Sequence, residues 1–387
     1  MSEPTAAPTT AIRVSTLELF FDLVFVFTIT QLTAILAEHL DLRHLVDVLL
    51  LLGVIWWMYS GYAWLTNAVA PNSTTRRSLL LTGMAGFLVM ALAIPDAFGR
   101  YGWVFGLSYL VVNLVHTALF LRAGPQAAVA LRRLAPLNIA SALLVLIGGV
   151  VPEPFRHLCW AAAVALQIAT PYLHRIEMHV LHAGHFVERH GLVVIVAIGE
   201  SIVAIGVGFA GVELDLAAIV VALLGLAIAY YLWWIYFAGD DERSEHVLAN
   251  TADPLRRTRL AVRAWGYAHY FLLLGIVVLA VGIKKTVGHA FDGMDWRYAI
   301  ALGGGVALYQ LGHAWFVGML HLPGWKHRVV AALAVLATIP LGHLVAVAQL
   351  AAIPLIMATA AIIEDVPRVR RSGGTAISTF GRTATPD

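Results

Sequence analysis

The chain has 387 residues, of which 60% are hydrophobic and only 12% are charged. Soluble domains carry roughly 25% charged residues, and a globule of this size has too little interior to bury so much apolar surface. The composition therefore excludes a water-soluble enzyme or binding module and predicts a protein surrounded by a lipid bilayer. The net charge of +2, without a long basic run, predicts no nucleic-acid partner.

Apolar runs long enough to span a membrane recur along the chain, since a spanning helix needs about 20 such residues. Twelve runs are predicted, near 17–37, 45–66, 78–98, 102–122, 135–151, 155–173, 191–211, 216–238, 262–283, 298–320, 329–345 and 347–363. The last two form one apolar stretch, which we divide because Pro340 and Gly342 disfavour a continuous helix. Backbone amides in lipid must be satisfied within their own segment, so the expected fold is all-α and polytopic.

The polar segments predict how the chain is placed in the membrane. Residues 1–12 and the basic segment 367–387 are rich in small and polar residues, and we expect disordered tails there. The connections at 174–190 and 239–258 are polar and are expected to lie along the membrane surface. About three quarters of the 25 Lys and Arg residues fall on the side of the N-terminus, which predicts a cytoplasmic membrane protein with both termini in the cytoplasm.

The chain also contains a weak internal repeat. Three segments of its first half resemble three segments of its second half in the same order: 18–31 and 188–201, 54–64 and 231–241, 113–125 and 310–324. This alignment places Thr30 on Glu200 and His116 on His313. It predicts two six-helix units, 13–173 and 174–366, the second beginning with an amphipathic linker. An even number of helices makes the repeat parallel, and in such proteins the binding site or pathway usually lies between the halves.

Two carboxylates lie in the first apolar run, within ELFFDLVFVFTITQ. At 100° per residue, Glu18, Asp22 and Thr33 share one helix face, with Thr30 beside it. Charged groups in membranes usually face an interior or an aqueous cavity, so we expect Glu18, Asp22 and Thr30 to line a substrate or ion pathway. The alternative is a structural role for both acids. In that case the positive end of the helix dipole stabilises the Glu18 carboxylate, and Asp22 pairs with an arginine such as Arg13.

Further ionisable groups lie deep in apolar runs. Glu200, in AIGESIVAIGVG, has to be protonated, paired or wetted. It is predicted to belong to the pathway, with a buried structural hydrogen bond as the alternative. His116 and His313 suit a proton relay, because the pKa of histidine lies near physiological pH. The alternative for both is a core histidine with a single hydrogen-bond partner.

Catalytic signatures are missing from the sequence. The histidine-rich stretch 174–190 lacks the spacing of a zinc site, and no phosphate-binding loop occurs. We therefore expect no catalytic residues, no metal and no cofactor. An intramembrane enzyme acting on lipids is the weakest alternative, because no cluster of nucleophile, base or metal ligands is evident.

Three motifs carry a family resemblance: STLELFFDLVFVFTITQLT, HFVERHGLVVIVAIGESIVAIG and LWWIYF. From about residue 13 to 365 the chain resembles the bacterial low temperature requirement A family. The resemblance implies an integral membrane protein linked by name to growth in the cold. It marks positions that match family motifs: Glu18, Asp22, Glu188, Arg189, Gly199, Glu200 and Trp234. Of these, Glu188, Arg189, Gly199 and Trp234 are expected to serve a structural ion pair or helix packing.

Two functions follow as hypotheses. The first is a permease or ion pathway for a small solute or ion, with the proton as the candidate coupling ion. The second is a membrane scaffold or sensor of lipid state that transports nothing. The sequence leaves open whether the chain assembles with further copies of itself.

Overall fold

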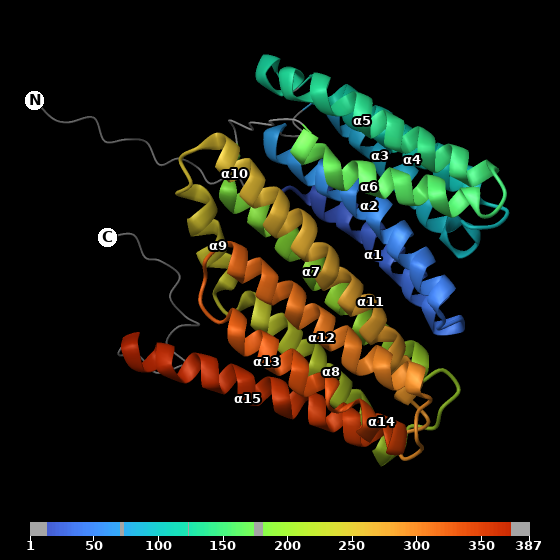
Figure 1. The fold of residues 1–387 in the computed structure, drawn as a ribbon, viewed down its shortest axis with the longest axis vertical. Coiled ribbons are helices and arrows are strands. Elements are labelled where there is room, and N and C mark those ends of the chain that lie inside the picture. The colour runs from blue at the N-terminus through green and yellow to red at the C-terminus, as the bar shows by residue number, and fades with distance from the viewer. Residues whose placement is uncertain (1–13, 70–72, 123, 174–180, 373–387) are drawn as a thin grey trace, which may run out of the picture.

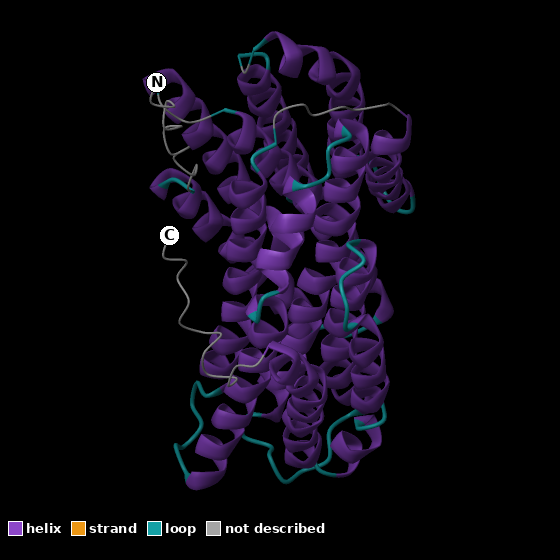
Figure 2. Cartoon of the chain, turned by 90° about the vertical axis from the view of Figure 1, so that its left-hand side faces the viewer, coloured by secondary structure: helices purple, strands orange, loops and turns teal. Residues whose placement is uncertain are grey.

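A computed structural model describes residues 14–69, 73–122, 124–173 and 181–372. Every regular element in these ranges is helical, as Figure 2 shows. Eleven helices are long and apolar enough to cross a membrane. The predicted all-α, multi-pass membrane fold is therefore confirmed.

The first half contributes α1 (Thr16–Glu38), α2 (Leu42–Ala68), α3 (Thr74–Ala93), the 3₁₀ turn η1 (Ile94–Asp96), α4 (Gly102–Phe120), α5 (Pro125–Val150) and α6 (Phe155–Leu173). The second half contributes α7 (Ala183–Gly208), α8 (Leu216–Phe237), α9 (Asp240–Ala249), α10 (Pro254–Ala261), the π-helical turn η2 (Val262–Ala268), α11 (His269–Thr286), α12 (Trp296–Met319), α13 (Trp325–Leu336), α14 (Ile339–Leu344) and α15 (Ala346–Ser372).

The predicted runs correspond to these helices, with two points of detail. The run at 155–173 forms α6, which is not among the eleven candidate spans. Polar side chains such as Arg156 and Gln167 lower its hydropathy. The final apolar stretch is broken into α13, α14 and α15, with Pro340 in the first turn of α14. Its predicted division near Pro340 is confirmed.

Two boundaries were predicted wrongly. α7 begins at Ala183, so residues 183–190 are helical and not a surface connection. Residues 183–190 have low hydropathy because they include buried polar side chains, and this low hydropathy predicted a loop. In the structure they form the first turns of α7, where Phe186 packs on Trp64 of α2 with ring centroids 4.8 Å apart. α15 continues to Ser372, so 367–372 is helical and not part of a disordered tail. The tail predictions for 1–12 and 373–387 lie outside the described residues.

The helices of the two halves lie on opposite sides of the molecule (Figure 1). Between them, α1 and α2 of the first half pack against α7 and α11 of the second. Within the first half α1 packs on α3 and α2 on α6, and within the second half α7 packs on α11 and α8 on α15. These pairings agree with the repeat, which stays a prediction.

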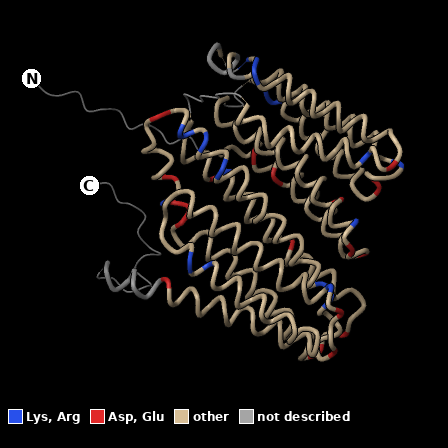
Figure 3. Tube along the Cα trace, in the orientation of Figure 1, with Lys and Arg blue, Asp and Glu red and all other residues tan. Residues whose placement is uncertain are grey.

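Charged residues gather at the helix ends, and the middle of the bundle carries few of them (Figure 3). Aspartates cap four of the described helices by accepting a backbone N–H bond: Asp41 on α2, Asp215 on α8, Asp253 on α10 and Asp295 on α12. The side chain and the amide of Arg297 both donate to Asp295 and lower its pKa to about 2. Uncapped donors at these ends would cost free energy in or near lipid.

The backbones of α11 and α12 approach closely through glycine. A Cβ added to Gly305 would lie 2.7 Å from the Cα of Leu279, and one added to Gly275 would lie 2.7 Å from the backbone N of Tyr309. Real Cβ atoms do not come this near to backbone, so only glycine allows this contact. The GGG stretch at 303–305 therefore includes a packing position.

We expect Gly305→Ala to destabilise the protein by about 1–3 kcal/mol through overpacking. Gly304→Ala is the matched control, because an added Cβ there meets only an Ile300 side-chain atom, 3.8 Å away. The control is expected to be neutral or to stabilise by up to about 1 kcal/mol, since alanine favours helix. Titration with a denaturing detergent measures both. Equal midpoints for the two variants would contradict the close backbone contact.

Candidate functional site

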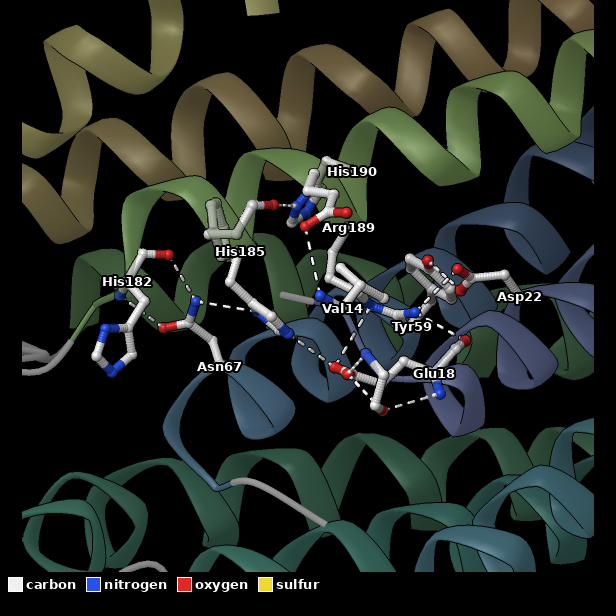
Figure 4. A network of polar contacts seen from close by, with 12 residues as sticks. Val14, Glu18, Asp22, Tyr59, Asn67, His182, His185, Arg189 and His190 are labelled. Atoms are coloured by element: carbon white, nitrogen blue, oxygen red, sulfur yellow. Dashed lines mark hydrogen bonds and ion pairs between the residues drawn. The ribbon is translucent and has the colours of Figure 1, made fainter. Parts of the chain in front are cut away.

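A buried ion pair joins the two halves at the start of α1 and α7 (Figure 4). Arg189 of α7 is 1% exposed, and its Nη1 lies 2.9 Å from Asp22 Oδ2 of α1. The same nitrogen donates to the backbone carbonyl of Glu18 at 2.8 Å. The Tyr59 hydroxyl of α2 donates to Asp22 Oδ1 at 2.7 Å, and its ring centroid lies 5.6 Å from the guanidinium carbon. Both oxygens of Asp22 are therefore bonded.

Glu18 extends this network toward the end of the bundle. It closes a capping box with Ser15, whose amide and hydroxyl both donate to Glu18 Oε2 at 2.8 Å. Its other oxygen, Oε1, lies 3.0 Å from Nε2 of His185 on α7 and 4.0 Å from Nε of Arg189. Glu18 is 3% exposed, so it is held inside the helix start and is not a freely hydrated surface charge.

Asn67 of α2 orients His185. Its amide bonds the backbone of His182 twice, accepting from the N–H at 3.0 Å and donating to the carbonyl at 2.8 Å. These two bonds identify which atom of the Asn67 amide is nitrogen and which is oxygen. The Asn67 nitrogen also lies 3.3 Å from His185 Nδ1. Nδ1 therefore accepts, and the ring proton lies on Nε2, which faces Glu18.

The charges of this network do not balance. Glu18 and Asp22 are two carboxylates, whereas Arg189 is the one permanently charged cation that contacts them within the described part of the chain. One additional proton would make these three groups neutral, so a single proton decides the net charge of this buried network. Arg13, the predicted partner of Asp22, lies outside the described residues.

A second bridge between the halves lies deeper along the same two helices. Thr30 Oγ1 of α1 donates to Glu200 Oε2 of α7 at 2.5 Å. Glu200 is buried. At 1.5 Å per residue this bridge lies about 12 Å along α1 from Asp22. Thr30 and Glu200, which the repeat places at equivalent positions, thus meet at the interface.

The two predicted relay histidines lie elsewhere, one in each half. His116 Nε2 is 3.1 Å from the Gly61 carbonyl of α2. His313 Nδ1 accepts from Arg328 Nε at 2.8 Å. The structure does not bring them together with Glu18, Asp22 or Glu200, so they cannot form one continuous relay with those groups by direct contact.

His313 belongs to a second buried charge cluster, inside the second half. Arg328 of α13 is 4% exposed and donates to Asp240 at 2.5 Å and to Glu364 of α15 at 2.9 Å. Asp240 also contacts Arg243. The cluster ties α9, α12, α13 and α15 together.

The four residues expected in packing roles differ from one another. Arg189 forms the central ion pair. Glu188 is exposed, and its Oε2 accepts from the Val14 amide at 3.4 Å. Trp234 packs on Tyr230, with ring centroids 5.9 Å apart. The prediction of close helix packing at Gly199 is wrong, because a Cβ added there would meet no atom within 4 Å.

Several site residues escaped the sequence reasoning: Tyr59, Asn67, His185, Asp240, Arg328 and Glu364. Two signals could have found some of them. The repeat aligns Tyr59 with Tyr236, an aromatic hydroxyl kept at equivalent places in both halves. Arg328 directly precedes the predicted run 329–345. Because α13 begins earlier, at Trp325, Arg328 is a buried residue of the helix and not part of the preceding loop.

Comparison with known proteins agrees with the motifs. The chain is 28% identical over 313 residues to an uncharacterized protein of Rhizobium meliloti (strain 1021), covering 77% of this chain and 75% of that protein. Residues 13–362 match the family described as bacterial low temperature requirement A protein (LtrA). This multi-pass membrane protein therefore belongs to the LtrA family.

Proposed function

We propose that this protein is a permease or ion pathway of the cytoplasmic membrane, with both termini in the cytoplasm and a route between its two halves. The observation that carries the proposal is the Asp22–Arg189 pair, which joins α1 to α7 across the inter-half interface. Apolar residues in place of a buried ion pair are often as stable or more stable, so fold stability gives little reason to place charges there. A functional role supplies the reason.

The charge balance favours the proton as the coupling ion. Glu18 and Asp22 share one permanent cation among the described residues, so the occupancy of a single proton decides the net charge of the site. Glu200 offers a second carboxyl, held by the Thr30 hydroxyl. Protonation of either carboxylate weakens its bonds across the interface.

The bridges describe a closed arrangement of the pathway. The Asp22–Arg189 and Thr30–Glu200 contacts both connect α1 to α7, so they hold the halves together at two heights. In parallel-repeat transporters, access alternates through movement of one half against the other. Breaking the bridges by protonation or solute binding would permit that movement here.

A scaffold or lipid-state sensor is the second candidate, and one observation favours it. Both oxygens of Asp22 are already bonded, to Arg189 and to Tyr59. A carboxylate satisfied in this way can serve to pin α1, α2 and α7 together without conducting anything. The two candidates differ in whether any solute or ion crosses the membrane.

Flux through proteoliposomes tests the proposal. A pH-sensitive dye inside the vesicles reports protons, and radiolabelled sodium, potassium and small solutes report the rest. We expect flux above that of empty vesicles, and a loss of at least tenfold in Glu200→Gln and in Asp22→Asn. Glu188→Gln removes an exposed carboxylate of α7 and is expected to keep wild-type flux. Flux of every solute equal to that of empty vesicles would favour the scaffold.

A further inference from the structure

A cavity of about 110 Å³ lies between the first half and residues 255–266 of the second half. Residues of α2, α4, α5 and α6 line it on the side of the first half, and residues of α10 and the π-helical turn η2 line it on the side of the second half. Its wall is largely apolar, with aromatic side chains Trp57, Trp64 and Phe120. Short π-helical segments often occur at functional sites. Here Gly266 of η2 lines the cavity, and its carbonyl accepts a bond from Trp56 Nε1 at 2.6 Å.

Two buried polar groups in the wall of this cavity have free hydrogen-bonding capacity. Ser60 is 8% exposed and His116 is 5% exposed. His116 Nε2 faces the Gly61 carbonyl at 3.1 Å, so Nε2 carries the proton and Nδ1 is an acceptor. Among the described residues, neither the Ser60 hydroxyl nor His116 Nδ1 has a partner. Buried polar groups rarely stay unsatisfied.

The equivalent position in the second half contains a smaller cavity. Its cavity measures only about 20 Å³ and is lined by Trp234, Ile235 and Ala238. The repeat aligns these residues with Trp57, Met58 and Gly61, which line the larger cavity.

Arg328 and Glu364 line the smaller cavity and form an ion pair with each other. The first half leaves the corresponding space open and lines it with apolar side chains. This difference distinguishes the larger cavity from an ordinary packing gap.

We propose that the larger cavity binds a small amphipathic molecule about one ring in size that carries an O–H or N–H donor. This cavity of about 110 Å³ is smaller than the apolar cavity of about 150 Å³ that holds benzene, so it limits the ligand to one ring at most. The donor binds His116 Nδ1, and the Ser60 hydroxyl completes the contact. Arg259, an exposed residue, also lines the cavity and pairs with no described carboxylate, so it favours a weakly acidic donor over a cation.

This site is separate from the charged network, although one helix carries both. On α2, Tyr59 faces Asp22, whereas its neighbours Met58, Ser60 and Gly61 line the cavity. Binding at the cavity is expected whether or not the protein transports ions. Failure of the binding test would leave the flux proposal standing, and the reverse also holds.

Phenol and toluene form the probe pair, because they differ only in a hydroxyl in place of a methyl group. Calorimetry on the full chain in lipid nanodiscs, with empty nanodiscs subtracted, measures binding. We expect saturable phenol binding with one site per chain, and toluene weaker by about fivefold, the worth of one neutral hydrogen bond. Ser60→Ala is expected to weaken phenol by a similar factor and to leave toluene unchanged.

A filling variant gives the second arm of the test. Leu134→Trp places a large side chain into the cavity and should abolish phenol binding. Leu333→Trp, at an exposed position on α13, is the control and should bind like wild type. Phenol binding no greater than in empty nanodiscs, or equal in wild type and Ser60→Ala, would overturn the proposal. The Ser60→Ala arm decides the matter if Leu134→Trp does not fold.

Discussion

Replacing Arg189 with methionine is expected to cost about 3–5 kcal/mol of stability, because it leaves two buried carboxylates without their permanent cation. Asp22 loses its 2.9 Å contact with Nη1, and the carbonyl of Glu18 loses its 2.8 Å donor. Methionine keeps an unbranched apolar stem at this position and removes the charge. The loss should appear as a lower midpoint in denaturing-detergent titration and as reduced folded yield.

Two further variants make this prediction specific. Glu188→Gln alters the preceding residue, which is exposed, and should change stability by less than about 0.5 kcal/mol. Adding Asp22→Asn to Arg189→Met should recover part of the loss, because one of the unpaired charges is then gone. Purely additive losses in this double-mutant cycle would mean that Asp22 and Arg189 do not interact.

The second large effect is expected at Arg328, the centre of the cluster inside the second half. Arg328→Met removes donors from Asp240, Glu364 and His313. Asp240 is 1% exposed, so its carboxylate would remain buried with Arg243 as its nearest cation among the described residues. Loss of one partner from a buried pair costs about 3–5 kcal/mol, and this cluster loses three contacts at once.

Detergent titration measures this loss too, with Arg256→Met as the control. Arg256 is exposed on α10 and should tolerate the change. The cluster lies outside the α1–α7 interface, so Arg328→Met that still folds should retain the Asp22–Arg189 coupling. An equal midpoint for Arg328→Met and Arg256→Met would show that the cluster contributes nothing to stability.

The helical fold was predictable because hydropathy over about 20 residues reports directly on burial in lipid. The error at the start of α7 follows from the same rule. His185, Arg189 and His190 are buried inside the protein and not in lipid, so a hydropathy window counts them as a loop. The sequence of a helix alone does not show that its polar side chains are buried against a neighbouring helix.

The acids of the site were predictable, whereas their partners were not. Glu18, Asp22 and Glu200 stand out because each is a charge within an apolar run. Tyr59 and Asn67 look like ordinary members of α2. The packing of α2 on α1 brings Tyr59 to Asp22, and its packing on α7 brings Asn67 to His185. The pairing of Thr30 with Glu200 likewise depends on how α1 meets α7.

Cross-linking between α1 and α7 tests the central claim most directly, namely that the acids of both helices face one shared interface. Thr30→Cys with Glu200→Cys, in a chain whose one cysteine is removed by Cys159→Ala, is treated in membranes with a short bifunctional thiol reagent that fluoresces only after joining two thiols. We expect fluorescence from this pair and none from Phe20→Cys with Val203→Cys, which are 51% and 46% exposed on the outer faces of the same helices. Fluorescence from the outer pair, and none from the Thr30–Glu200 pair, would contradict the account.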